Sequence, residues 1–240
     1  KHPVVLSCCM IFSLALSLGA SWLEPKLDNY RVTVLDVGQG QCIILQSGDR
    51  HYIVDCGGNN AADSAAQRLL SQGVDRIDGL FLTHYDEDHA GDAANFLMRI
   101  DCDRLYLPDI EPDDPLRKQL ASAYTNKISW IDENIALGAN GVGISVYPSQ
   151  NRTGSNESGM CLLFQMKNCD ILITGDWSSG NERQLVSEQD LPRLELLIAG
   201  HHGSNSSTSF ELLSETMPHT AIISVGKNNS FGHPSREVLD

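Results

Sequence analysis

The segment Thr83-His84-Tyr85-Asp86-Glu87-Asp88-His89-Ala90-Gly91 says most about the fold of this chain. It follows an apolar, strand-like run and leads into a stretch with helical periodicity. Imidazoles and carboxylates alternate within it, and a loop at a strand end can aim such side chains at one point. Mixed nitrogen and oxygen donors suit Zn²⁺, Mn²⁺ or iron. A solvated acidic turn would explain the carboxylates, but not two histidines beside them in a chain with 8 His.

Two further segments have the same form. Residues 171–176 (ILITGD) predict a buried strand that ends in Asp176, and residues 196–204 (LLIAGHHGS) predict a strand followed by His201 and His202. An aspartate after a strand is usually a helix cap, and capping is the alternative for Asp176. Core packing gives no reason for a His pair at a Gly-rich turn. Three apolar strands that end in potential ligands therefore predict a metal centre along one rim of the sheets.

Short β-branched runs alternate with helical patterns outward from these segments. We expect strands over 31–37, 41–46, 51–55, 79–82, 104–107, 128–131, 135–137, 142–147, 160–166, 170–173, 194–198 and 220–225. We expect helices over 61–71, 90–100, 116–125, 178–188, 210–215 and 234–240, and a polar loop over 151–159. This alternation predicts an α/β (α+β) chain with two sheets and helices packed outside them.

Composition narrows the function classes. The chain has 240 residues, a formal net charge of -14, 41% hydrophobic and 20% charged residues. This balance excludes a wholly disordered protein and a multi-span membrane protein. The acid excess argues against a free-standing protein that grips nucleic acid through a basic surface. The 7 Cys are scattered without a C-x-x-C pair, which favours buried free thiols over a disulfide framework or a cysteine zinc site.

The N-terminal residues form a separate region. Residues 3–23 (PVVLSCCMIFSLALSLGASWL) carry no charged side chain. A helix of this length can span a bilayer, so we expect the end of a membrane-spanning region over 1–23 and a linker over 24–30. A signal peptide and a buried soluble helix are the alternatives. Because the chain starts at Lys1 and stops at Asp240 inside a predicted helix, we expect a piece of a longer protein, with one folded domain over 31–240 that is truncated at its C-terminus.

These motifs together resemble those of the metallo-β-lactamase fold superfamily, whose first motif is H-x-H-x-D-H. More narrowly, the chain is similar to the C-terminal hydrolase-like domain of the ComEC family of DNA-uptake channel proteins. The matching segments, in family order, are 34–40 (VLDVGQG), 54–58 (VDCGG), 83–91 (THYDEDHAG), 174–176 (TGD), 201–204 (HHGS), 223–226 (ISVG) and 232–234 (GHP). The resemblance implies an αββα four-layer sandwich preceded by a membrane region.

The resemblance also implies a set of metal ligands. His84 and Asp86 would bind a first ion, and Asp88 and His89 would bind a second. Asp176 would bridge the two ions. The expected cofactor is one or two divalent ions, Mn²⁺ or Zn²⁺.

The remaining ligand and the chemistry follow from the same resemblance. One of His201 and His202 would complete the second site; His202 is favoured, with His201 as a neighbour that contacts substrate. A metal-bound hydroxide would attack a phosphorus atom. Asp88 and Asp176 are the expected catalytic residues, with Asp88 orienting the nucleophile.

The sequence departs from the superfamily pattern in two ways. Asp86 replaces the second His, which is typical of the ComEC-like branch. A further superfamily His is missing, because no His occurs between His89 and His201. Asn156 is a candidate substitute or a substrate contact. Either the first site is weak, oxygen-rich and suited to Mn²⁺, or only the second site is occupied.

Four further residues have two interpretations each. Asp36 and Asp55 lie at strand ends. In one interpretation each carboxylate supports a metal ligand or holds a loop in place; in the other it takes part in the site directly. Ser204 either hydrogen-bonds a phosphate or caps the following helix. His233, before Pro234, either donates to a phosphate or begins a surface helix.

The leading hypothesis is a metal-dependent phosphodiesterase or nuclease domain of a competence membrane protein at the cytoplasmic membrane, facing outward. Its expected partners are DNA, the membrane and other components of the uptake machinery. We expect the DNA to be single-stranded. Because the net charge is -14, other parts of the protein would have to supply much of the attraction for DNA. The alternatives are an extracytoplasmic hydrolase of a small or wall-polymer phosphodiester, and a catalytically silent structural or gating module. Lactam hydrolysis is not expected, since the ligand set departs from that branch.

Overall fold

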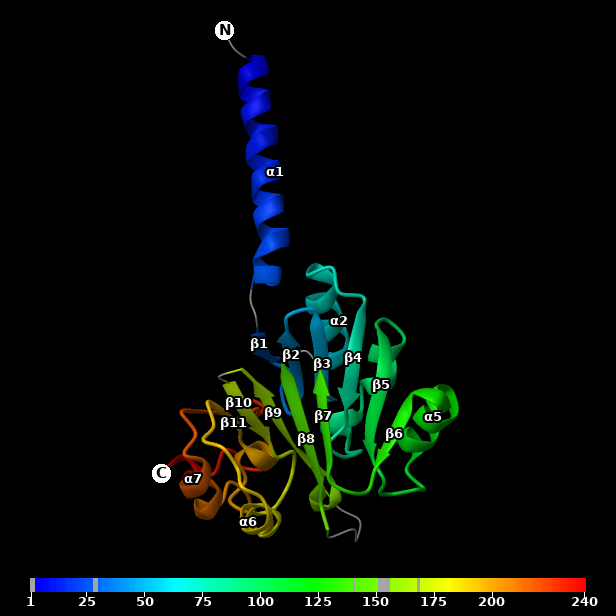
Figure 1. Ribbon diagram of the computed structural model, residues 1–240, viewed down its shortest axis with the longest axis vertical. Helices are drawn as coiled ribbons and strands as arrows, with labels where there is room; N and C mark the ends of the chain where they lie inside the picture. The colour runs from blue at the N-terminus through cyan, green and yellow to red at the C-terminus, as the bar shows by residue number, and fades with distance from the viewer. Residues whose placement is uncertain (1–2, 28–29, 140, 151–155, 168) are drawn as a thin grey trace.

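Two six-stranded sheets lie face to face at the centre of the computed structural model, which describes residues 3–27, 30–139, 141–150, 156–167 and 169–240 (Figure 1). The first sheet has the order β1 (Tyr30–Val34), β2 (Cys42–Ser47), β3 (Arg50–Cys56), β4 (Arg76–Phe81), β5 (Asp101–Pro108) and β6 (Ile128–Ile131). The second has the order β12 (Thr220–Ile222), β11 (Leu196–Ile198), β10 (Cys169–Ile173), β9 (Met160–Met166), β8 (Val142–Pro148) and β7 (Ile135–Ala139).

The two sheets have similar connectivity. Strands β1 to β3 are antiparallel, whereas β3 to β6 run parallel. In the second sheet, β7 to β10 are antiparallel and β10 to β12 run parallel. Parallel strands end at the same edge of a sheet. The loops after β4, β10 and β11, which carry the predicted ligands, therefore emerge at carboxyl edges.

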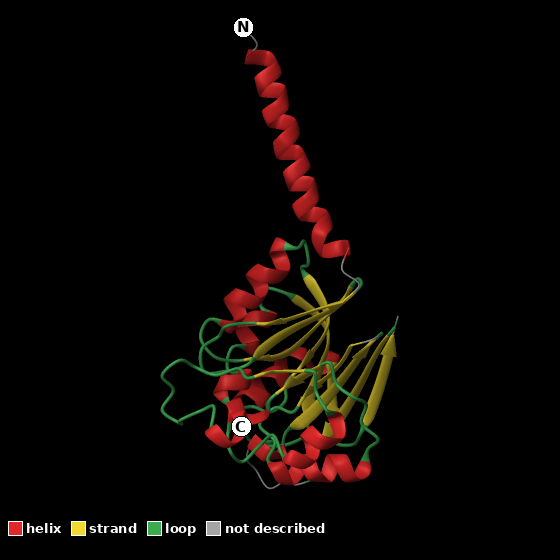
Figure 2. Cartoon of the chain, turned by 90° about the vertical axis from the view of Figure 1, so that its left-hand side faces the viewer, coloured by secondary structure: helices red, strands yellow, loops and turns green. Residues whose placement is uncertain are grey.

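The central strands of both sheets, such as β2, β3 and β9, are buried on both faces, as their apolar runs predicted. In β2, Ile43 and Leu45 point into the core between the sheets, while Ile44 points to the outer face. In β9, Phe164 packs into the same central core and Leu163 faces outward. This alternation with period two places apolar side chains in three layers. They separate the two sheets from each other and from the helices outside them, whose arrangement Figure 2 shows. The predicted αββα sandwich is confirmed.

Helices cover the outer faces. The first sheet is covered by α2 (Ala61–Ser71), α3 (Glu87–Ala90), α4 (Ala93–Leu97) and α5 (Pro115–Tyr124). The second is covered by α6 (Ser179–Glu188) and α7 (Phe210–Thr216). The remaining short elements are η1 (Thr125–Lys127), η2 (Asn156–Ser158), η3 (Gly200–Gly203) and α8 (Arg236–Leu239).

Several predicted elements differ from the structure. The strand expected over 31–37 ends at Val34, and the helix expected over 234–240 spans only 236–239. The helix expected over 90–100 is broken into α3 and α4. Asp92 interrupts it, because its N–H donates to the Cys56 carbonyl (2.9 Å) and its carboxylate accepts the Ala62 N–H (2.8 Å). The strand expected over 220–225 ends at Ile222, and Ser224 beyond it bonds to the loops of the site instead.

Helix α1 (Pro3–Leu27) extends from the sandwich in both views (Figures 1 and 2). Its described side chains, residues 4–20, are all exposed. Among the helices of the described residues, none is both long enough and apolar enough to cross a membrane. The membrane span predicted over 1–23 is therefore not confirmed.

Candidate metal centre

The loop after β4 is fixed against the ends of β2 and β3. A Cβ atom on Gly57 would lie 2.2 Å from the Asp88 carbonyl carbon and 2.3 Å from the His89 nitrogen, so only glycine permits this approach. The Gln41 N–H donates to the Asp88 carbonyl at 2.8 Å. The backbone that carries two predicted ligands is thus held by neighbouring strands rather than by its own short helix.

Asp55 is the extra residue of a β-bulge. Cys42 pairs with Cys56 and Ile43 pairs with Val54, so Asp55 has no partner on β2, and its φ is 59°. Bulges near active sites re-aim a side chain. Here the bulge turns a fully buried carboxylate toward the loop after β4.

Both oxygens of Asp55 are occupied by donors. Oδ1 accepts the Thr83 N–H at 2.7 Å. Oδ2 lies 2.8 Å from the Thr83 hydroxyl, the Gln41 amide and His89 Nδ1. Because these bonds use both oxygens, the geometry places Asp55 behind His89 as a support, and not among the atoms that face the centre.

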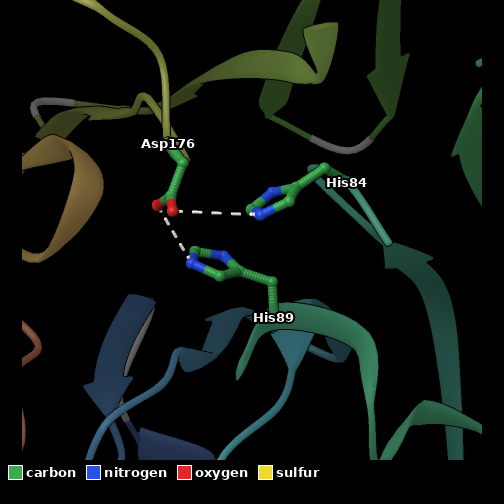
Figure 3. Close-up of side chains that lie close together, drawn as sticks. All are labelled: His84, His89 and Asp176. Carbon is green, nitrogen blue, oxygen red and sulfur yellow. Dashed lines mark ion pairs between the residues drawn. The ribbon is translucent and has the colours of Figure 1, made fainter. Parts of the chain in front are cut away.

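The buried histidines share one arrangement, in which each Nδ1 atom faces an oxygen acceptor. The pairs are His84 with Thr83 Oγ1 (3.0 Å), His89 with Asp55 Oδ2 (2.8 Å) and His202 with the Ser224 carbonyl (2.7 Å). A neutral imidazole has one N–H, so whenever these rings are neutral this network favours the proton on Nδ1 and leaves the lone pair of Nε2 for a ligand. All three Nε2 atoms lie within 4.0 Å of the Asp176 carboxylate; Figure 3 shows two of them.

The first cluster, the His89 site, consists of Asp88, His89, His202 and Oδ1 of Asp176. His202 Nε2 lies 3.2 Å from both Asp88 Oδ2 and His89 Nε2. His89 Nε2 lies 3.0 Å from Asp176 Oδ1. Ligand atoms around a tetrahedral zinc ion, with bonds of about 2.0–2.1 Å, are separated by about 3.3 Å. The spacing of the His89 site therefore fits a divalent ion.

The second cluster, the His84 site, consists of His84, Asp86 and Oδ2 of Asp176. His84 Nε2 lies 3.9 Å from Asp176 Oδ2 and 4.0 Å from Asp86 Oδ2. It is buried and makes no hydrogen bond. A buried polar atom normally has a partner, and a metal ion would supply one here. The kinds of donor atom suit a metal ion, but these atoms lie farther apart than the neighbouring ligand atoms of the His89 site.

Protonation states mostly suit metal binding. Burial, followed by the nearby His89, lowers the pKa of His84 to about 4, so this ring is neutral at pH 7. Burial raises the pKa of Asp176, but His89, His84 and His202 together outweigh burial and hold that pKa well below its usual value. Burial also raises the pKa of Asp88, but the hydrogen bond to His202 and the charges of His89 and His202 together lower it. The carboxylates of Asp176 and Asp88 are thus ionised, as ligands must be, whereas burial and the nearby Asp88 raise the pKa of Asp86.

His89 is the exception. Burial lowers its pKa, but the carboxylates of Asp176 and Asp55 outweigh burial and hold the pKa well above its ordinary value. A metal ion that binds Nε2 must therefore displace a proton from this ring.

Two more predicted site residues lie beside the centre. His201 is 32% exposed, and its Nε2 lies 3.8 Å from Asp176 Oδ2. His202, and not His201, belongs to a group of three close ligand atoms. The ring of His233 lies 6.0 Å from that of His201. Both rings line the groove described below.

The other predicted residues do not meet the ligands. Asp36 is exposed and accepts the Gly38 N–H at 3.3 Å. Ser204 is buried in a turn, where its hydroxyl lies 2.9 Å from that of Ser206. The side chain of Asn156 lies outside the described residues. Asp176 and Ser204 are also not helix caps, which was the alternative for each. The residue before α6 is Ser178, and the residue before α7 is Ser209.

A groove opens over the metal centre and runs along the N-terminal end of α2 and along α4, from Asp92 before that helix to Arg99 after it. Its charged lining residues, histidines apart, are Asp63, Asp86, Glu87, Asp88, Asp92, Asp176 and Arg99. The single arginine pairs with Asp63. Without metal ions the groove is therefore strongly acidic and would repel a phosphate group.

Known proteins share both the sequence pattern and the fold. The pattern of the Metallo-beta-lactamase superfamily matches residues 35–227. The chain is 27% identical to ComE operon protein 3 of Bacillus subtilis (strain 168) over 97% of its length, and 30% identical to Recombination protein 2 of Haemophilus influenzae over 98%. It spans only 32% and 29% of these two relatives.

Among solved structures, the metallo-beta-lactamase fold protein YhfI from Bacillus subtilis matches with a TM-score of 0.58 at 15% identity, over 88% of this chain and 92% of that one. At this identity the likeness shows the fold alone. The relatives confirm the resemblance to the ComEC family over the part that this chain covers. Since the superfamily pattern covers most of the sandwich and its metal centre, the chain belongs to the metallo-beta-lactamase superfamily.

Proposed function

We propose that this chain is a metal-dependent phosphodiesterase that hydrolyses DNA as part of a DNA-uptake protein. The observation that carries the proposal is the arrangement of His84, His89 and His202, whose Nε2 atoms all face the Asp176 carboxylate at the base of a groove. The relative named Recombination protein 2 supports a role in DNA metabolism.

One or two Mn²⁺ or Zn²⁺ ions belong to the proposal. The His89 site and the His84 site would hold them, with Asp176 shared between the two. When bound, such ions supply positive charge beside the phosphoryl oxygens and a water of lowered pKa.

The chain's own residues would orient the reactants. Asp88 is 34% exposed and reaches both the groove and the His89 site, so its ionised carboxylate can orient the attacking water and accept its proton. His201 and His233 line the groove beside the centre, where they can donate to phosphate oxygens. Asp176, almost fully buried, would keep both clusters at a fixed spacing.

The acidic groove supports one alternative substrate. Among the described residues that line the groove, the one arginine, Arg99, is already paired with Asp63, so this lining offers little attraction to a long polyanion. A small or zwitterionic phosphodiester, free or part of a wall polymer, would bind with less repulsion than DNA. DNA binding would therefore depend on the metal ions and on parts of the protein outside this chain.

The proposal includes a location at the outer face of the cytoplasmic membrane, with the membrane and other uptake components as partners. The family resemblance alone supports this location. Protease protection of the full-length protein in intact cells and in inverted vesicles would test it. Cleavage of the sandwich only in inverted vesicles would place the domain on the opposite face.

The activity is tested on the chain 1–240, purified in mild detergent and loaded with Mn²⁺ or Zn²⁺. We expect metal-dependent cleavage of a labelled single-stranded DNA. The Asp88→Ala/His89→Ala double variant should lower the rate by on the order of 10³-fold. The control is Asp63→Ala, which changes a groove carboxylate away from the ligands. Cleavage of a small phosphodiester but not of DNA would favour the alternative, and failure to bind metal would overturn hydrolysis altogether.

A further inference from the structure

An exposed aromatic side chain stands at the groove beside the metal centre. Phe231 is 67% exposed and lines the groove. Its ring stacks on that of His233, with centroids 5.8 Å apart and planes 15° apart. The His233 ring in turn lies 6.0 Å from that of His201. A continuous row of flat rings therefore leads from open solvent to the ligand cluster.

The loop that carries Phe231 and His233 is held in place by its own hydrogen bonds. Asn229 Oδ1 accepts the N–H groups of Phe231 (3.0 Å) and His233 (3.1 Å), and its amide donates to the carbonyls of Gly226 (3.0 Å) and His233 (2.7 Å). The Gly226 N–H donates to Gln39 Oε1 at 3.0 Å, which ties the loop to the opposite lining of the groove. Because the Phe231 ring is mostly exposed, its packing contributes little to the stability of this loop. Packing therefore does not explain why an aromatic side chain stands here.

The chemistry of the groove narrows what the ring can bind. Because carboxylates line the groove, its surface is acidic and does not attract the phosphate backbone. Stacking on an aromatic face does not depend on charge, and every nucleobase has such a face. Neutral amides of Gln39, Asn59 and Asn60 also line the groove, and they can hydrogen-bond bases or sugars.

We propose that Phe231, backed by His233, is a stacking platform for a nucleobase next to the phosphodiester held at the metal centre. The platform rests on the proposed phosphodiesterase function and narrows its substrate to single-stranded nucleic acid. In a duplex the base is stacked and paired, so it would have to be flipped out before it reached the ring.

The test measures binding separately from cleavage. Chain 1–240 with Mn²⁺ is titrated into a single-stranded phosphorothioate oligonucleotide that carries 2-aminopurine, whose fluorescence is quenched when the base stacks. Phe231→Ala should weaken binding about 10-fold and abolish the protein-induced quenching. Phe231→Trp should restore both. Phe210→Ala is the matched control, because Phe210 is 80% exposed but lies on α7 outside the groove lining.

An oligonucleotide with abasic positions completes the test. The wild-type chain should bind it as weakly as Phe231→Ala binds the intact strand. Equal affinity of the wild type for intact and abasic strands, or an unchanged Phe231→Ala, would overturn the platform even in a chain that cleaves DNA. Binding that depends on Phe231 in a chain that cleaves nothing would support the platform and overturn the proposed hydrolysis.

Discussion

The two halves of the metal centre share Asp176 but hold their other ligands differently. In the His89 site the neighbouring ligand atoms lie 3.0–3.2 Å apart, with one longer distance of 4.0 Å between His202 and Asp176. In the His84 site the corresponding distances are 3.9 Å and 4.0 Å. The first cluster is already close to the size of a tetrahedral ion site, whereas the second must contract around its ion.

The difference follows from the groups behind the ligands. His89 bonds to the Asp55 carboxylate, which β3 holds in place, and His202 bonds to the backbone carbonyl of Ser224. His84 bonds to the Thr83 hydroxyl, which is a weaker acceptor than a carboxylate, and the Asp86 side chain is 42% exposed. Outer groups orient ligands and raise their affinity. We therefore expect the His89 site to fill first and the His84 site to fill only at higher metal concentration.

The largest effect is expected from Asp176→Asn, which removes the charge common to both sites but keeps the volume. Both ions should be lost, and cleavage should fall by on the order of 10³-fold or more. Metal content by mass spectrometry and the rate on single-stranded DNA check this. Asp63→Asn, in the same groove, should keep both ions. One tightly bound ion in Asp176→Asn would show that the clusters are independent.

Single histidine variants test the order of filling. His84→Ala should retain one ion per chain, because the His89 site stays complete. His202→Ala should weaken the first ion by about 100-fold or more. Equilibrium dialysis against Mn²⁺ measures both. The reverse result, with one ion kept in His202→Ala and none in His84→Ala, would contradict the comparison.

Asp55→Asn tests the support behind His89. An amide cannot accept all the donors that meet this carboxylate, so the first ion should bind about 10–100-fold more weakly. The matched control is Asp78→Asn, because Asp78 accepts the His51 N–H (2.8 Å) at the other end of β3. Both variants should lower Tm, but only Asp55→Asn should change metal affinity. Equal affinities would make Asp55 a purely structural residue.

Much of the fold was predictable because it depends on local pattern. Continuous apolar runs in β2 and β9 predict strands that are buried on both faces, and the sandwich follows from them. The candidate ligands were also predictable, since imidazoles and carboxylates at the ends of apolar strands have few structural uses. Whether they bind metal stays a prediction.

Features that depend on strand register, or on contacts between residues far apart in the sequence, could not be predicted from the sequence alone. The bulge at Asp55 exists only because Cys42 pairs with Cys56, and no local signal marks it. The bond from His202 to the Ser224 carbonyl joins segments 22 residues apart. Phe231 was overlooked because an exposed phenylalanine has no motif; only its place in the groove gives it meaning.

The smallest expected effect is the pH dependence of the affinity of the His89 site for its ion. The pKa of His89 is raised in the metal-free chain by Asp176 and Asp55 against the effect of burial, so its protonated form stabilises the folded state. This stabilisation is complete below the unfolded pKa of about 6.5 and is lost as pH rises through the folded pKa. Metal binding competes with the same proton. Affinity at the His89 site should therefore rise by up to about tenfold per pH unit between pH 6 and the folded pKa.

The His84 site should lack this dependence, because the pKa of His84 is lowered to about 4 by burial and by His89, and the ring is neutral throughout that range. Calorimetry with Mn²⁺ in buffers of different protonation enthalpy counts the protons released. We expect about one from the first ion and fewer from the second. Asp55→Asn removes one of the charges that raise the His89 pKa, so it should reduce the first release. Release of a proton with the second ion alone would assign the tight site to His84 and reverse the comparison.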